Sequence, residues 1–167
     1  VTVTDSEGGT DSETITLTVN AVNDAPILTD IGDQVTDEDT DFTIDLSASD
    51  VDIDENNQTL TYSATSSDES LVLVSTTASE DGTSGTLTFD VLDEQNGAAE
   101  ITVTVNDAQG RAIDSETFTL TVNAVNDAPI LTDIGNQVTD EDTDFTIDLS
   151  ASDVDIDENN QSLTYSA

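Results

Sequence analysis

The sequence contains no cysteine, histidine, methionine, tryptophan or lysine, and these absences exclude several kinds of chemistry. Without cysteine and histidine the chain has no disulfides, no zinc-finger ligands and no triad that depends on a histidine base. Without lysine it forms no Schiff base and no lysine–asparagine isopeptide bond. It also lacks an apolar run of about 18 residues, so we expect no direct membrane insertion.

Positive charge is almost absent as well. One basic residue, Arg111, stands against 38 acidic residues, which gives a formal net charge of -37. Nucleic acid is excluded as a partner because phosphate binding requires a basic patch, and an anionic membrane surface would repel the chain. An acidic chain with 4% aromatic residues can also be disordered. The alternation of apolar and polar residues in segments such as 42–48 and 100–106 instead favours half-buried β-strands.

What is present is an internal repeat. Residues 11–64 and 114–167 differ at three of 54 aligned positions, and the phrase NAVNDAPILTDIG begins at Asn20 and again at Asn123. The period of 103 residues suits a domain that buries its own core and is joined to others in tandem. We therefore expect three parts. Residues 1–22 end one repeat, residues 23–125 form a complete repeat, and residues 126–167 begin another.

The complete repeat has the pattern of an all-β domain. Strands are expected at about 26–36 (broken near Gly32), 42–48, 58–64, 70–76, 84–91, 99–106 and 115–122. Turn signals such as Asn96-Gly97 separate them. Seven short strands in this length predict Greek-key β-sandwiches of immunoglobulin or cadherin type, strung end to end. The expected inward residues are Phe42, Ile44, Leu46, Leu60, Tyr62, Leu87, Phe89, Ile101, Val103, Val105, Phe118, Leu120 and Val122.

The acidic residues are concentrated in the loops, and the topology of such a sandwich sorts these loops onto two poles. The pole where the chain enters is expected to gather Asn23, Asp24, Asp50, Asp52, Asp54 and Asp107. The pole where it leaves is expected to gather Glu38, Asp93, Asn126 and Asp127, with Glu94 as a further candidate and with Asp153, Asp155 and Asp157 from the next repeat.

Carboxylates at that density repel one another, and a divalent cation with six to eight oxygen ligands would relieve the repulsion. The alternating Asp50, Asp52 and Asp54 suit a shared ion, although the loop lacks the glycine and the final glutamate of an EF-hand. We therefore expect Ca²⁺ at each junction between repeats. The competing interpretation is that these are solvated loop acids of a salt-adapted surface, with no ordered metal.

These residues resemble a cadherin repeat, and more closely the cadherin-like tandem repeats of giant bacterial surface adhesins, including the RTX type. The linker VNDAP resembles the cadherin linker, DVD at 50–52 resembles its Asp-x-Asp motif, and LDEQ at 92–95 resembles Leu-Asp-Arg-Glu. The resemblance implies junction Ca²⁺ held by these motifs. Ala21 and Gln95 depart from the pattern, which implies one or two ions per junction instead of three.

Three functions compete. The first is a structural extender of a bacterial cell-surface adhesin or biofilm protein, stiffened by Ca²⁺ and contacting the neighbouring repeats of its own chain. The second is an extracellular module that binds carbohydrate or protein, although sugar sites usually stack on exposed aromatic rings and six Phe and Tyr residues are present in all. The third, a glycosidase built on paired carboxylates such as Asp50 and Asp52, is disfavoured because no cleft is implied. We expect no enzymatic activity.

Overall fold

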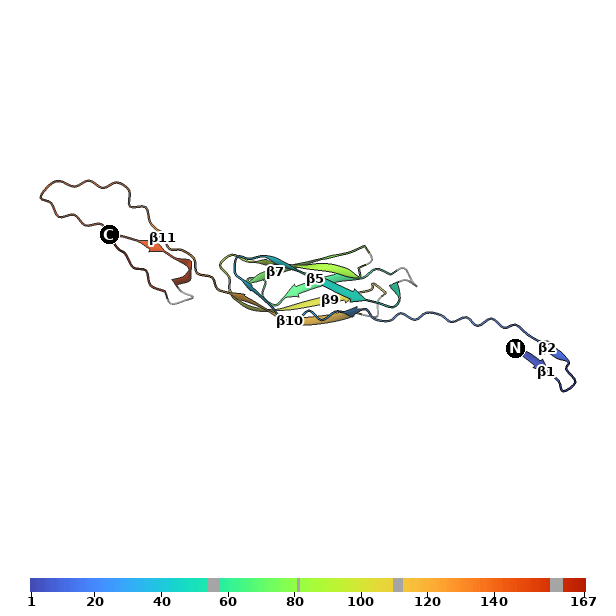
Figure 1. Ribbon diagram of the computed structural model, residues 1–167. Coiled ribbons are helices and arrows are strands. Elements are labelled where there is room, and N and C mark those ends of the chain that lie inside the picture. The colour runs from blue at the N-terminus through green and yellow to red at the C-terminus, as the bar shows by residue number, and fades with distance from the viewer. Residues whose placement is uncertain (54–57, 81, 110–112, 157–160) are drawn as a thin grey trace.

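The complete repeat is a sandwich of two four-stranded sheets, and it lies between two smaller segments at the ends of the chain (Figure 1). The computed structural model describes residues 1–53, 58–80, 82–109, 113–156 and 161–167. One sheet has the strand order β3-β5-β8-β7 and the other β4-β10-β9-β6. The all-β Greek-key sandwich expected from the sequence is thus confirmed.

The strands follow the predicted alternation closely. They are β3 Ile27–Leu28, β4 Gln34–Asp37, β5 Phe42–Ser49, β6 Thr61–Ser66, β7 Val72–Ala78, β8 Ser84–Val91, β9 Gly97–Asn106 and β10 Ile113–Asn123. Every pair of neighbouring strands is antiparallel except β4 and β10, which are parallel. The turns after β5 and β9 lie at one end of the sandwich and those after β4 and β8 at the other, and all four contain acidic residues.

The core is made of the inward residues of both sheets. Ten of the thirteen expected inward residues are buried, and Phe42, Ile44 and Tyr62 pack against the core while remaining partly exposed. The aromatic rings form one cluster in which Phe42 stacks on Phe89 with centroids 4.3 Å apart, and Phe118 meets Phe89 edge-on at 6.4 Å. Leu28, Leu71, Val72 and Val91 were not predicted but are also buried. Burial at these positions stabilises the repeat mainly through the hydrophobic effect.

The first predicted strand, 26–36, is divided between the two sheets. Its start, β3, pairs with β5, and its end, β4, pairs with β10. The crossing segment has few backbone partners, and acidic side chains of β10 accept its N–H groups instead. Asp114 Oδ2 accepts from Leu28 N at 2.9 Å, and both Glu116 oxygens accept from Ile31 N at 2.9 and 3.0 Å. Some acids therefore serve the fold itself.

Replacing Glu116 by Gln is expected to lower the free energy of unfolding by about 1–2 kcal/mol, because the amide offers the N–H groups of Ile31 and Gly32 one neutral acceptor oxygen in place of two charged ones. Urea unfolding in EDTA measures the effect. The matched control is Glu100→Gln on β9, where the exposed side chain should tolerate the change within about 0.5 kcal/mol. Equal effects of the two substitutions would show that Glu116 contributes nothing specific.

The two outer segments, at the N- and C-termini, each form one short pair of strands and not a sandwich. At the N-terminus β1 Thr2–Thr4 pairs with β2 Thr10–Ser12, and at the C-terminus β11 Ile130–Leu131 pairs with β12 Ala151–Ser152, followed by the 3-10 turn η1 Val154–Ile156. Residues 13–20, which repeat the sequence of 116–123 with one change, form no strand. Their counterpart in β10 pairs with both β4 and β9, whereas residues 1–22 contain no equivalent of β4. Among the described residues, no helix has the length and apolar character needed to cross a bilayer.

Candidate metal centre at the junctions

The upstream pole of the complete repeat collects the linker 21–25 and two acidic loops. Asn23 Nδ2 donates to Asp107 Oδ2 at 2.7 Å, and the backbone N–H of Asp24 donates to Asp52 Oδ2, also at 2.7 Å. The backbone N–H of Asp52 donates in turn to Asp50 Oδ1 at 2.8 Å. Asp52 and Asp107 are buried, with 4% and 1% of their surface exposed. Residues far apart in sequence therefore meet where the chain enters the sandwich.

The same contacts recur one period later at the downstream linker, residues 124–128. The backbone N–H of Asp127 donates to Asp155 Oδ2 at 2.6 Å, and the N–H of Asp155 donates to Asp153 Oδ1 at 3.0 Å. Asp155 is buried, with 2% exposed. The repetition shows that the loop after β5, and its copy after β12, bind the linker by the same local geometry.

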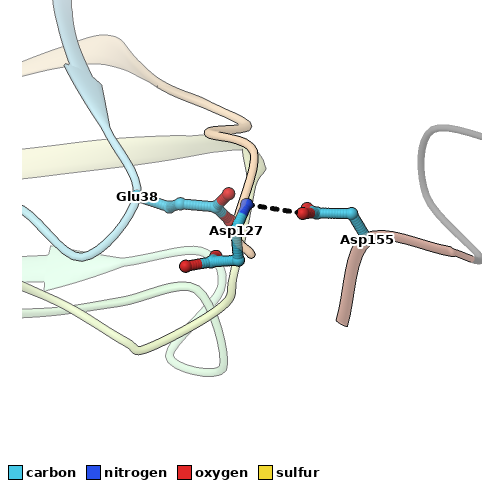
Figure 2. A group of neighbouring side chains, drawn as sticks. All are labelled: Glu38, Asp127 and Asp155. Atoms are coloured by element: carbon cyan, nitrogen blue, oxygen red, sulfur yellow. Dashed lines mark hydrogen bonds between the residues drawn. The ribbon is translucent and has the colours of Figure 1, made fainter. Parts of the chain in front are cut away.

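At the downstream linker, residues of the complete repeat that comes before it also take part in the contacts. Glu38, in the turn after β4, accepts from the N–H of Val125 at 2.6 Å and is 3% exposed. Carboxylate oxygens of Glu38, Asp127 and Asp155 lie within 4.8 Å of one another, and we call these three residues the bridging group. Figure 2 shows Glu38 and Asp155 extending toward each other from opposite sides of Asp127. The bridging group therefore draws on both repeats and on the linker between them.

A second group of carboxylates adjoins the first. Oxygens of Asp39, Glu94 and Asp127 also lie within 4.8 Å of one another, and we call this the outer group because Asp39 is exposed. Asp39 and Glu94 sit in turns with left-handed backbone, at φ 58° and 57°, and Glu94 N donates to Asp39 Oδ1 at 2.9 Å. Such a backbone is uncommon outside glycine and costs about 1 kcal/mol per residue. Asp127 belongs to both groups.

The donor set fits a hard cation such as Ca²⁺. All ligands in both groups are carboxylate oxygens, and oxygens around one Ca²⁺ lie no more than about 5 Å apart because each Ca–O distance is about 2.4 Å. Asp127 Oδ2 is a buried oxygen without a hydrogen-bond partner among the described residues. At this spacing ionised carboxylates repel one another, most strongly in the bridging group, where Glu38 and Asp155 are buried. A cation between them would remove that repulsion.

The pKa of one of these acids, Glu94, lies well above its normal range. Partial burial, followed by the negative charges of Asp127, Asp39 and Glu38, raises the pKa of Glu94 from 4.5 to about 7. Desolvation and like charge both disfavour the ionised carboxylate. Without a cation, there is therefore a pH range, from about 4.5 to 7, in which the folded protein keeps a proton at Glu94 and the unfolded chain has released it.

This shift predicts a pH dependence in EDTA. Between about pH 4.5 and 7 the folded state holds more protons at Glu94 than the unfolded state does, so the free energy of unfolding should fall as pH rises through that window. Urea unfolding at several pH values measures the trend, and Glu94→Gln should flatten it. A trend that persists unchanged in Glu94→Gln would contradict this origin.

The structure brings most of the predicted ligands together in two sets of contacts, one at each linker. The upstream contacts bring together Asn23, Asp24, Asp50, Asp52 and Asp107, and the downstream contacts bring together Glu38, Asn126, Asp127, Asp153 and Asp155. Asp93 is exposed and belongs to neither carboxylate group of the described residues. Asp54 and Asp157 lie outside the described residues.

Sequence reasoning missed Asp39 and named Glu94 only as a further candidate. Both lie in acidic runs, Asp37 to Asp41 and Asp93-Glu94, so the runs themselves were a signal. The left-handed turns decide which acid of each run faces the pole, and the left-handed residues themselves, Asp39 and Glu94, are not the glycine or asparagine that usually marks such a position.

Comparison with known families decides the class of the repeat. The profile of the bacterial Ig domain family matches residues 23–123, which is more than half of the chain. The chain belongs to this family. In this bacterial Ig domain, the matched region begins at Asn23, the first linker residue bonded to the sandwich, and ends at the last residue of β10.

Solved structures resemble the bacterial Ig domain at low identity. Drosophila N-cadherin matches with 18% identity and a TM-score of 0.48, over 79% of this chain and 34% of that one. Domains 4 and 5 of the S-layer protein SbsC match with 19% identity and a TM-score of 0.41, over 72% and 55%. The sialic-acid-binding region of a Streptococcus sanguinis adhesin matches with 18% identity and a TM-score of 0.44, over 77% and 37%. No curated protein matches the chain.

Proposed function

We propose that the chain is a structural extender: a stretch of tandem bacterial Ig domains whose junctions bind Ca²⁺ and thereby hold successive repeats in line. The observation that carries the proposal is the bridging group, because Glu38 comes from one repeat and Asp155 from the next. A cation bound there would join two repeats through the linker residue Asp127. Binding to the aligned junction, and not to a loose one, favours the aligned form by linkage.

The composition of the junction supports Ca²⁺ over Mg²⁺. Two adjoining groups that share Asp127 offer five carboxylates, and Ca²⁺ accepts six to eight oxygens in a flexible arrangement. Mg²⁺ demands a near-ideal octahedron and retains several waters. Two groups correspond to two ions at this junction. Extracellular modules bind Ca²⁺ with dissociation constants of about 10⁻⁴–10⁻³ M, which suits the millimolar Ca²⁺ outside cells.

We place the chain on a bacterial cell surface, within a long adhesin or biofilm protein of the RTX kind. Three properties support this placement: the family is bacterial, the repeats are nearly identical, and the net charge is -37. Near-identical repeats suit a spacer, in which reach matters more than individual surfaces. The adhesion ligand would then be bound by other parts of the parent protein.

Direct carbohydrate binding by the repeat is a weaker alternative. Phe89 and Phe118 of the complete repeat are buried, and Phe42 and Tyr62 pack against the core. Phe145 and Tyr165 are about half exposed, at 47% and 48%, but they are the counterparts of Phe42 and Tyr62 in the partial repeat. The complete repeat therefore offers no broad aromatic platform among its described residues.

Thermal unfolding of the chain in EDTA, in millimolar CaCl₂ and in MgCl₂ at constant ionic strength tests the proposal. A specific junction site predicts a large rise of the melting temperature with Ca²⁺ and a small one with Mg²⁺. Equal small shifts with both ions would indicate screening of the net charge, and the metal assignment would be withdrawn.

A further inference from the structure

The linker is fastened to the repeat that follows it by hydrogen bonds that require no cation. At the upstream pole, Asn23 donates to Asp107 and Asp24 donates to Asp52, both at 2.7 Å. The amide group of Asn23 also donates to the carbonyl oxygen of Asp24 at 2.9 Å. Here the Asn23 NH₂ group occupies the space between two oxygens, so this side of the linker is held without a metal.

One buried glutamine sets the orientation of that asparagine. Gln58 is 6% exposed, and its Nε2 donates to Asn23 Oδ1 at 2.5 Å. The bond turns the oxygen of Asn23 toward Gln58 and leaves its NH₂ group facing Asp107. One period later Gln161 Nε2 donates to Asn126 Oδ1 at 2.7 Å, so the arrangement recurs. Gln58 thus acts on the linker through Asn23.

The burial of Gln58 is unfavourable for the sandwich itself. Its Oε1 is buried and has no hydrogen-bond partner among the described residues. Burying a half-satisfied amide destabilises a fold relative to an apolar side chain of similar size. Among the described residues, the hydrogen bond of this amide goes to Asn23 of the linker, which indicates that the glutamine serves the linker and not the core.

The opposite side of the linker is held differently. Toward the preceding repeat, the N–H of Val125 donates to Glu38 Oε1 at 2.6 Å. The other groups of the preceding repeat that lie close to the linker are the carboxylates of Glu38, Asp39 and Glu94, which face Asp127. Without a cation these charges repel, so this side is the weaker one.

We propose that Gln58 and Gln161 are positioning residues that fix each linker to the following repeat, so that the cation-dependent hinge lies at the start of the linker, at Ala124. Each linker then moves as part of the repeat that follows it. The role of the glutamine stands on the hydrogen bonds above, whereas the cation dependence of the hinge rests on the proposed function. Ca²⁺ at the bridging group would close a single defined hinge at each junction.

Spin labels on introduced cysteines test the hinge, since the chain has no cysteine of its own. Val22, Ser75 and Ala128 are exposed sites for labels. The pair at 22 and 75 reports the linker against the following repeat, and the pair at 75 and 128 reports the next linker against the preceding repeat. In EDTA the first pair should give a narrow distance distribution and the second a broad one. CaCl₂ should narrow the distance distribution of the pair at 75 and 128 and leave that of the pair at 22 and 75 unchanged.

Gln58→Leu separates positioning from folding. We expect the distribution for the pair at 22 and 75 to broaden at least twofold in EDTA, while the melting temperature stays the same or rises. Gln95→Leu, an exposed glutamine of the downstream pole, is the control and should leave this pair unchanged. A pair that stays narrow in Gln58→Leu, or is already broad in the unaltered chain, would overturn the role of Gln58.

The two proposals fail separately in this experiment. If CaCl₂ does not narrow the pair at 75 and 128, the cation-dependent hinge and the proposed function both fail. The role of Gln58 would still be decided by the pair at 22 and 75, which is measured without a cation.

Discussion

Asp127→Asn is expected to weaken Ca²⁺ binding at the downstream junction by roughly 10- to 100-fold, or about 1.4–2.7 kcal/mol. Asp127 supplies a carboxylate to both the bridging and the outer group, so its loss removes a charged ligand from two places at once. The affinity of such sites depends on the number of charged ligands. Isothermal titration with CaCl₂ measures the change.

The chain contains a matched control for this substitution. Asp24 occupies the same position in the upstream linker, with the same neighbours in sequence, but it is exposed and belongs to neither carboxylate group of the described residues. Asp24→Asn should therefore leave the Ca²⁺ affinity of the downstream junction within about twofold. Equal losses in the two variants would show that net charge, and not the junction, determines the affinity.

Phe89→Ala is expected to lower the free energy of unfolding by about 3–5 kcal/mol. Phe89 is fully buried and contacts both Phe42 and Phe118, so truncation leaves a cavity at the centre of the aromatic cluster. A domain of this size has a total stability of about 5–15 kcal/mol, so the variant would be close to unfolding at 37 °C. Urea unfolding in CaCl₂ measures the difference.

The control for Phe89 is another phenylalanine of the same chain. Phe145 is 47% exposed, so Phe145→Ala should change the free energy of unfolding by less than about 0.5 kcal/mol. A loss below about 1 kcal/mol for Phe89→Ala would contradict the assignment of this cluster as the centre of the core.

The strands were predictable because each one alternates apolar and polar residues over most of its length. Phe42–Ser49 and Ser84–Val91 show this pattern, and the structure places them as neighbours in one sheet. The division of the first strand into β3 and β4 was less accessible. It depends on acids of β10 accepting N–H groups of residues 28–32, a contact between positions more than 80 residues apart.

The junction residues were predictable as loops but not as individual side chains. Loop topology alone assigns Glu38 and Asp127 to the same pole. Within an acidic run, however, neighbouring residues point in different directions. Glu94, and not Asp93, belongs to the outer group because of the left-handed turn at Glu94. Gln58 carried no signal, because a glutamine beside a polar loop is usually solvated.

The most direct test of the central claim is small-angle X-ray scattering from a chain of two complete repeats, in EDTA and in millimolar CaCl₂ at equal ionic strength. The account predicts that Ca²⁺ produces a single elongated particle with the two repeats in line, and that EDTA or Asp127→Asn produces a broad range of shorter dimensions. Scattering profiles that are the same with and without Ca²⁺ would contradict the claim that the ion holds the repeats in line.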